Sequence, residues 1–340
     1  MKNLLRFRVK ALMLTAIFLI GIAGMLSAQK IAIIDAGSSG SVLYVYEWNK
    51  IDKKLIVLHS GSGKKDDTEG KILAKVDNTN EAAKAYLTKM TSEYQNTDSN
   101  PIPLYVLATA GMRKPGDKNP IYDTIESCTI SGYSDIKAMT ISGRYEGLYA
   151  WIAANYENGK IGIDTSGPKP VLKEQPPTCG ILEIGGASMQ ITYKAEGRGD
   201  YIDHKKFDNI YSKSYLGCGV NSVFDKYISE TEPYDFTTLN MGLKAIPSDT
   251  FFWGLGGSIG ACFEEGKTLD KYIQDHKSDN PTDHTHHSYM NGIYIKYITG
   301  CLGLNLDTTL LPPVKPSNWT EGAALDILIN ENEPEAYNNN

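Results

Sequence analysis

Two acidic residues stand at matching places in two similar stretches of the sequence, and their neighbours indicate phosphate chemistry. Asp35 ends the apolar run 31–34 and precedes a turn of small residues, Gly37, Ser38, Ser39 and Gly40. Glu183 ends a second apolar run and precedes the small residues Gly185, Gly186 and Ala187. Glycine-rich turns direct backbone N–H groups toward a bound anion, and carboxylates bind divalent ions. Each stretch therefore predicts a phosphate-binding turn with a metal-binding carboxylate beside it.

The repetition of this pattern is more informative than either copy. Residues 31–34 and 43–46 predict two strands, the first buried on both faces because it has no polar alternation. Taken alone, the turn between them is equally well explained as an ordinary Gly/Ser hairpin. Asp35 and Glu183 are 148 positions apart, which indicates two related halves that face each other across a cleft.

Two further positions could take part in such chemistry. Residues 147–156 predict an amphipathic helix, and Glu146 stands at its start, where a carboxylate either activates a water molecule or only favours the helix dipole. For this residue in isolation the dipole role is the stronger interpretation. Thr109 lies in the small-residue turn after the predicted strand 102–107. Its hydroxyl either contacts phosphate or belongs to an ordinary tight turn.

The remaining helices, strands and loops have less distinct sequence patterns. We expect helices at residues 81–94, 119–128, 221–227, 289–302 and 319–329, a strand and turn at 251–258, and an interdomain loop at 157–178. The rest of 50–100 is predicted to alternate between weak helix and polar loop. His284, His286 and His287 fall in a predicted polar loop at 279–288. Without cysteines or well-spaced carboxylates there, a solvated tract is favoured over a metal site.

Composition and the first residues narrow the class of protein. The chain has 340 residues, enough for two domains, and a formal net charge of −6, which argues against a nucleic-acid partner. Residues 1–28 combine a basic start with an apolar run at 11–26 and predict a signal peptide, or alternatively a retained N-terminal membrane anchor. We therefore expect a secreted or periplasmic protein. Among its five cysteines, Cys262 and Cys301 are a candidate disulfide pair.

Several stretches together resemble one family in the right order. They are DAGSSGS, ATAGMR, GRYEGLYAWIAANY, ILEIGGASMQITY, SYLGCG and NWTEGAAL, and they look like the signature regions of the ecto-nucleoside triphosphate diphosphohydrolases, or apyrases. The resemblance implies an α/β fold of two actin-like (ribonuclease H-like) domains with a nucleotide cleft between them. We assign the domains to residues 29–156, completed by 305–340, and 157–304.

The resemblance also implies roles for the matching residues. Glu146 matches the general base, Ser188 and Gln190 match the residues that hold the attacking water, and Asp35 and Glu183 match the carboxylates that bind Mg²⁺ or Ca²⁺, largely through its waters. The phosphate-binding group comprises Gly37, Ser38, Ser39, Gly40, Thr109, Gly185, Gly186 and Ala187. The implied activity is metal-dependent removal of terminal phosphates from nucleoside tri- and diphosphates. For the base, candidates for stacking are aromatic residues of the C-terminal half, chiefly Tyr294, Tyr297 and Trp319, although core packing is the stronger interpretation for any one of them.

Three residues depart from the family pattern, and they leave two alternative functions open. Val42 stands where the family usually has arginine, Glu183 replaces aspartate, and Tyr145 replaces the first of two glutamates. One alternative is another actin-like enzyme, such as a sugar kinase or a polyphosphatase. The second is a nucleotide-binding or host-interaction protein that has lost turnover on the same fold.

Overall fold

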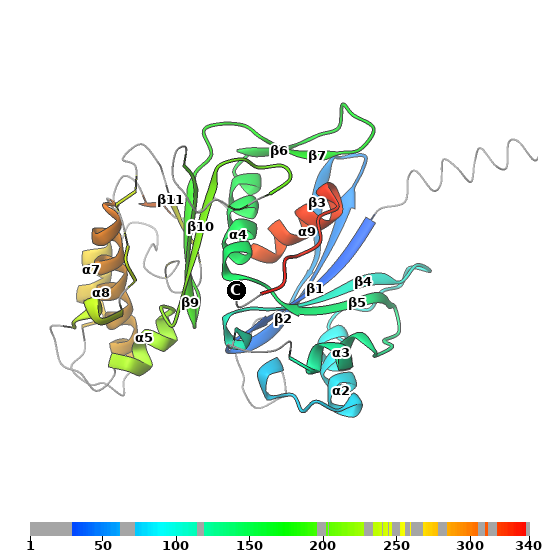
Figure 1. Ribbon diagram of the computed structural model, residues 1–340, viewed down its shortest axis with the longest axis horizontal. Coiled ribbons are helices and arrows are strands. Elements are labelled where there is room, and N and C mark those ends of the chain that lie inside the picture. The colour runs from blue at the N-terminus through cyan, green and yellow to red at the C-terminus, as the bar shows by residue number, and fades with distance from the viewer. Residues whose placement is uncertain are drawn as a thin grey trace, which may run out of the picture.

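The protein is built around two five-stranded sheets that repeat one topology (Figure 1). The computed structural model describes residues 29–61, 72–113, 119–195, 202, 204–227, 234–239, 241–243, 245–246, 252–255, 259, 268–277, 284–304, 310–311 and 318–337. In the first sheet the order is β3 (Lys54–Ser60), β2 (Gly40–Asn49), β1 (Gln29–Gly37), β4 (Ile102–Ala108), β5 (Tyr133–Thr140). In the second it is β10 (Ile210–Leu216), β9 (Ser188–Lys194), β8 (Gly180–Ile184), β11 (Phe252–Leu255), β12 (Leu310–Leu311).

The strand directions are the same in both sheets. The first three strands of each form an antiparallel meander, β1–β2–β3 and β8–β9–β10. The two strands that follow, β4–β5 and β11–β12, run parallel to the first strand of their sheet. This duplicated α/β arrangement confirms the predicted actin-like fold class, whereas the proposed limits of the two domains stay a prediction.

The helices and sheets form alternating layers, as Figure 1 shows. Helices α2 (Asn80–Thr91) and α3 (Ile121–Glu126) cover the outer face of the first sheet. Helices α5 (Val220–Tyr227), α7 (Leu269–Asp275) and α8 (His284–Leu302) cover the outer face of the second. Between the sheets lie α4 (Gly143–Glu157) and α9 (Trp319–Asn330), which pack on each other. Each sheet is therefore buried on both faces.

Strand β1 illustrates why an apolar run without alternation is required here. Ile31 and Ile33 pack toward α4 and α9, while Ala32 and Ile34 pack toward α2 and α3. All four are at most 1% exposed. The prediction of a strand buried on both faces is therefore confirmed.

Helix α4 is more deeply buried than its sequence pattern indicated. Its side chains are buried from Glu146 to Asn155 without interruption, so the prediction of an amphipathic helix is wrong. Two glycines make this possible. A Cβ on Gly147 would lie 2.5 Å from Thr192 Oγ1 of β9, and a Cβ on Gly322 of α9 would lie 1.9 Å from the Tyr149 carbonyl oxygen. Glycine at these positions lets α4 approach the second sheet and α9 approach α4.

Other local predictions need correction. Strand β3 lies in a region predicted as weak helix and loop, and β6 (Ile161–Asp164) pairs with β7 (Val171–Glu174) in the predicted interdomain loop. Helix α8 begins at His284, inside the stretch predicted as a polar loop. These strands are short, and much of their length is partly exposed, which leaves little hydrophobic periodicity to detect.

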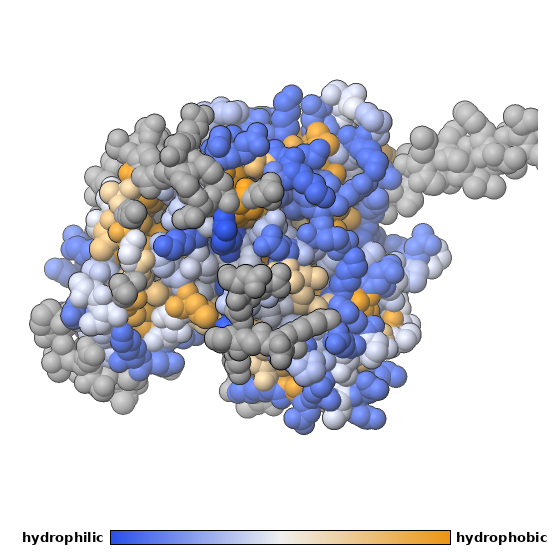
Figure 2. Space-filling view, in the orientation of Figure 1, coloured by the Kyte–Doolittle hydropathy of each residue, from blue (hydrophilic) through white to orange (hydrophobic). Residues whose placement is uncertain are grey.

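A notch divides the surface between the side that carries α5 and the side that carries α2 and α3 (Figure 2). Within the described part of the chain, no helix combines the length and hydropathy needed to cross a membrane. The predicted signal segment, residues 1–28, lies outside the described residues.

Candidate functional site

The two glycine-containing turns face each other and enclose a cavity of about 220 Å³. A Cβ on Gly186 of the second turn would lie 3.3 Å from Ser38 Oγ of the first. Eleven of the thirteen residues predicted for the site line this cavity, namely Asp35, Gly37, Ser38, Ser39, Thr109, Glu146, Glu183, Gly185, Gly186, Ala187 and Ser188. Gly40 and Gln190 do not line it. The sequence therefore identified most of one real cavity from segments far apart in the chain.

The two turns are equivalent in structure. Asp35 pairs with Val42 across the β1–β2 hairpin, and Glu183 pairs with Gln190 across the β8–β9 hairpin. The offset of 148 residues thus relates Gln190 to Val42 as well as Glu183 to Asp35. Val42, where the family usually has arginine, stands directly opposite one of the two acids.

Each turn is held by a neighbouring segment. Gly111, in the short helix η3 (Ala110–Met112) after β4, packs against Ser38 so closely that a Cβ there would lie 2.8 Å from the Ser38 Cα. In the second turn, the carbonyl of Ala187 accepts from the N–H of Gly217 at 2.8 Å, and that of Gly186 accepts from Asn221 at 2.9 Å. The predicted motifs ATAGMR and SYLGCG therefore act as supports for the turns.

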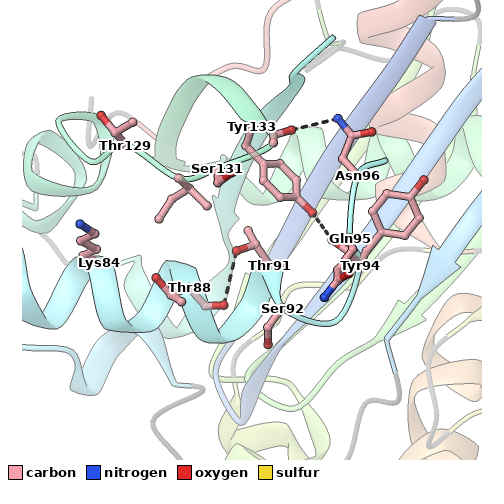
Figure 3. Close-up of a pocket in the computed structure, with 12 residues that line it drawn as sticks. Lys84, Thr88, Thr91, Ser92, Tyr94, Gln95, Asn96, Thr129, Ser131 and Tyr133 are labelled. Atoms are coloured by element: carbon pink, nitrogen blue, oxygen red, sulfur yellow. Dashed lines mark hydrogen bonds between the residues drawn. The ribbon is translucent and has the colours of Figure 1, made fainter. Parts of the chain in front are cut away.

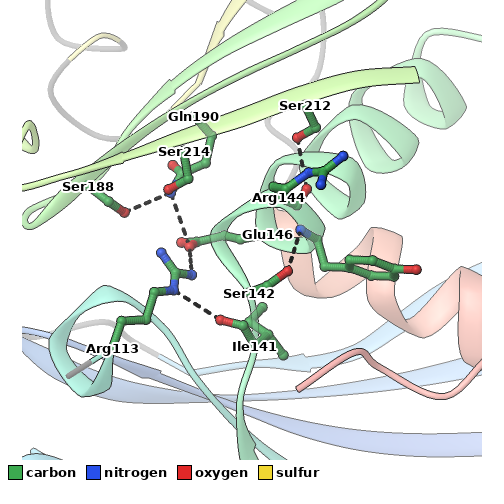
Figure 4. A network of polar contacts seen from close by, with 10 residues as sticks. Arg113, Ile141, Ser142, Arg144, Glu146, Ser188, Gln190, Ser212 and Ser214 are labelled. Atoms are coloured by element: carbon green, nitrogen blue, oxygen red, sulfur yellow. Dashed lines mark hydrogen bonds and ion pairs between the residues drawn. The ribbon is translucent and has the colours of Figure 1, made fainter. Parts of the chain in front are cut away.

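Glu146 reaches the second hairpin from the first turn of α4 (Figure 4). Ser142 caps the N-terminus of this helix, and its side chain accepts a hydrogen bond from the backbone N–H of Tyr145 at 3.3 Å. The amide Nε2 of Gln190 donates to Glu146 Oε2 at 3.1 Å and to Ser188 Oγ at 2.7 Å. Gln190 thus links the predicted base to the predicted water-binding serine from behind the cavity wall.

Arg113 is a functional candidate that the sequence reasoning missed. Its guanidinium forms an ion pair with Glu146 Oε2, and its Nε donates to the Ile141 carbonyl at 3.0 Å. The side chain is buried, which is unusual for arginine unless it is paired. The available signal was an arginine placed directly after a strand and a small-residue turn.

Burial and neighbouring carboxylates raise the pKa of Asp35 and of Glu183. Burial and the charge of Glu146 raise the pKa of Asp35 to about 7, although the indole N–H of Trp319 donates to Asp35 and partly offsets the shift. Burial, then the charges of Glu146 and Asp35, also raise the pKa of Glu183, while Arg113 lowers it. The arrangement therefore concentrates negative charge that a bound cation would relieve.

The donor set fits a hydrated divalent ion better than a fully protein-bound one. Oxygen ligands suit Mg²⁺ and Ca²⁺, and Glu183 Oε2 is buried without a hydrogen-bond partner. Among the described residues, however, no group of three or more His, Cys, Asp and Glu side chains is arranged to hold an ion alone. Waters and phosphate oxygens would have to complete the coordination.

The raised pKa values predict how pH affects the metal-free protein. A carboxyl group whose folded pKa lies above its unfolded value stabilises the fold at low pH, and this stability is lost as pH rises through the folded pKa. For Asp35 the loss falls between about pH 4 and pH 7. We expect Mg²⁺ or Ca²⁺ to raise the Tm more at pH 8 than at pH 5. The difference should be ~2–4 °C for each ~1 kcal/mol of carboxylate destabilisation that the ion relieves. Differential scanning fluorimetry with cation and with EDTA measures this, and Asp35→Asn should reduce the difference. Equal cation effects at both pH values would contradict the prediction.

Comparison with known proteins assigns the chain to a family. The sequence profile of the GDA1/CD39 (nucleoside phosphatase) family matches residues 27–234, more than half of the chain. The chain belongs to the GDA1/CD39 nucleoside phosphatase family. The apyrase resemblance drawn from the signature motifs is therefore confirmed.

Individual members of this family are moderately similar. The chain is 30% identical over 195 residues to ectonucleoside triphosphate diphosphohydrolase 1 of Bos taurus, covering 54% of this chain and 38% of the relative. It is 31% identical over 216 residues to a guanosine-diphosphatase of Candida albicans, covering 56% and 33%. A match to ectonucleoside triphosphate diphosphohydrolase 3 of Homo sapiens is 26% identical over 271 residues and covers 74% and 50%. The chain thus spans between a third and a half of the length of these curated relatives.

Solved structures support the fold independently. The crystal structure of a Ppx/GppA family member from Aquifex aeolicus is 15% identical, has a TM-score of 0.52, and covers 90% of this chain and all of that one. A type II variant of the Aquifex aeolicus Ppx/GppA phosphatase gives a TM-score of 0.50 at 16% identity, covering 88% and 99%. At this identity the likeness concerns the fold alone.

The predicted base-stacking residues do not gather as expected in this member of the nucleoside phosphatase family. Tyr294 is fully buried in the core of the second sheet and donates its hydroxyl to the Cys218 carbonyl at 2.8 Å, so it cannot stack on a nucleotide. Tyr297 packs at the edge of the same core. Trp319 does line the cavity, but as the partner of Asp35.

The predicted disulfide between Cys262 and Cys301 finds no support, since Cys301 is a free thiol and Cys262 lies outside the described residues.

A second, larger cavity of about 600 Å³ lies apart from the carboxylates (Figure 3). It is bounded by α2 and by the segment before β5, with Lys84, Thr88, Gln95 and Ser131 among its lining residues. None of its lining residues is acidic, and the described lining includes neither of the two glycine-containing turns. The smaller cavity is therefore the candidate active site.

Proposed function

We propose that this chain hydrolyses the terminal phosphate of nucleoside tri- and diphosphates with the help of Mg²⁺ or Ca²⁺. The observation that carries the proposal is that one cavity brings together three carboxylates, two glycine-containing turns and Ser188. Membership of the nucleoside phosphatase family supports the same class of reaction.

In this proposal the two turns bind the phosphates. Backbone N–H groups of Gly186 and Ala187 and the hydroxyls of Ser38, Ser39 and Thr109 offset the charge on the phosphate oxygens. Asp35 and Glu183 hold the waters of a divalent ion, which supplies further neutralisation of that charge when it is bound. None of these contacts requires a positively charged side chain, in accord with Val42 in place of the usual arginine.

Glu146 acts as the general base. Ser188 and Gln190 orient a water molecule, Glu146 accepts its proton, and the oxygen attacks the terminal phosphorus in line with the leaving oxygen. The P–O bond to the remaining nucleotide breaks, and inorganic phosphate is released. The link from Gln190 to both Glu146 Oε2 and Ser188 Oγ supports this division of roles. We also propose that the protein acts outside the cytoplasm, on the basis of residues 1–28.

The test is a panel of phosphate-release assays. Purified protein is incubated with ATP, ADP, GTP, GDP and UDP, each with Mg²⁺, Ca²⁺ or EDTA, and with polyphosphate in parallel. We expect metal-dependent release from several nucleotides. Release from polyphosphate alone would favour the polyphosphatase alternative. Nucleotide binding by calorimetry without release would instead favour a binding protein that has lost turnover.

A further inference from the structure

Arg113 connects the end of the first sheet to α4, the helix that carries Glu146. It follows η3, at the end of β4, and its Nε donates to the carbonyl of Ile141, the residue after β5. Its Nη2 reaches Glu146 on α4 (Figure 4). The side chain is only 4% exposed, so its position is determined by these contacts and by packing.

The contacts on Glu146 are asymmetric. Both the Arg113 guanidinium and the Gln190 amide donate to Oε2. A carboxylate oxygen that accepts two such hydrogen bonds has little remaining capacity to accept a proton. Oε1 is consequently the oxygen left for the attacking water.

Arg113 also acts on the negative charge that the carboxylates place around the cavity. Asp35, Glu146 and Glu183 line the cavity, and its described lining residues include no lysine, arginine or histidine. Arg113 stands directly behind Glu146, and its positive charge acts on Glu183 as well. A buried arginine in this place offsets part of the negative charge of Glu146 and Glu183.

We propose that Arg113 is a positioning residue that fixes Glu146 through Oε2 and leaves Oε1 directed to the attacking water. This inference rests on the proposed function. Arg113 acts through Glu146 and does not itself line the cavity, so it affects the chemical step more than nucleotide binding.

The first experiment compares Arg113→Ala with the wild type in steady-state ATP hydrolysis with Mg²⁺. We expect kcat to fall ~10²-fold while KM changes less than ~3-fold, because the base is misplaced but the phosphate turns are intact. Guanidinium chloride at sub-denaturing concentration should restore part of kcat. Arg113→Lys, which keeps one charge but cannot contact Ile141 and Glu146 with a planar fork, should be intermediate and folded. Arg144→Ala, at an exposed arginine on α4, the helix that carries Glu146, is the matched control.

A double-mutant cycle separates this role from a structural one. If Arg113 acts through Glu146, Arg113→Ala should cost little further activity in a Glu146→Gln background. Full additivity, or a kcat for Arg113→Ala within ~3-fold of wild type, would overturn the inference while leaving the proposed function standing. An unfolded Arg113→Ala together with a fully active Arg113→Lys would overturn it too. A wild-type protein that releases no phosphate would overturn both proposals.

Discussion

Replacing Glu146 by glutamine should lower kcat by ~10²–10⁴-fold and leave nucleotide affinity nearly unchanged. Glutamine keeps the shape of the side chain and can still meet Gln190, but it cannot accept a proton from water. Binding measured by calorimetry with a non-hydrolysable nucleotide, beside kcat from phosphate release, separates the two effects. Activity within a few-fold of wild type would remove Glu146 from the mechanism.

The matched control is Glu157→Gln at the other end of α4. Eleven residues of helix place it ~16 Å from Glu146, so it tests the same substitution on the same helix away from the cavity. We expect wild-type kcat and a Tm close to that of wild type. If both variants lost activity equally, the effect would have to be assigned to α4 as a whole.

Removal of the divalent ion should abolish hydrolysis, and Asp35→Ala should not be rescued by adding it back. Asp35 and Glu183 come from equivalent hairpins and line the same cavity, so loss of either weakens the site. We expect EDTA to reduce phosphate release to background and Mg²⁺, Ca²⁺ or both to restore it. Asp35→Ala should lose ~10²–10³-fold in kcat at saturating metal.

The Asp35→Ala substitution should affect stability and activity differently. Because the pKa of Asp35 is raised in the fold, removing its charge should not lower the Tm of the metal-free protein at pH 8. Asp52→Ala, in the exposed turn at the opposite end of the ten-residue strand β2, is the control and should keep full activity. Full activity in EDTA, or in Asp35→Ala, would leave both acids with no role beyond their turns.

The cavity was predictable because its parts are local patterns. An apolar strand, an acid and a glycine turn follow one another within ten residues, and the 148-residue repeat indicates that two such turns belong together. The Asp35 and Glu183 turns do meet. Nothing in the sequence near Arg113 identifies Glu146 as its partner, because 33 residues and a complete strand, β5, separate them.

The errors have a common physical cause. Helix α4 was expected to have a polar face, but it lies between two sheets. Asn155, for example, is fully buried there and donates to the Trp151 carbonyl at 2.9 Å and to the Cys179 carbonyl at 3.0 Å. Tyr294 was a candidate for stacking because the sequence does not reveal which aromatic side chains of a helix the rest of the chain buries. Tertiary packing, which local periodicity does not encode, decided both cases.

The close packing of α4 on the second sheet has a consequence for motion. Gly147 brings the helix into direct contact with Thr192 of β9, on the strand that begins at Ser188 and includes Gln190. Glu146, Ser188 and Gln190 are therefore held together by helix–sheet packing as well as by hydrogen bonds. Across the cavity, the turn of Ser38 and Ser39 is supported by Gly111, two residues before Arg113, which contacts Glu146. The groups proposed to activate water would therefore stay assembled whether or not a nucleotide is bound.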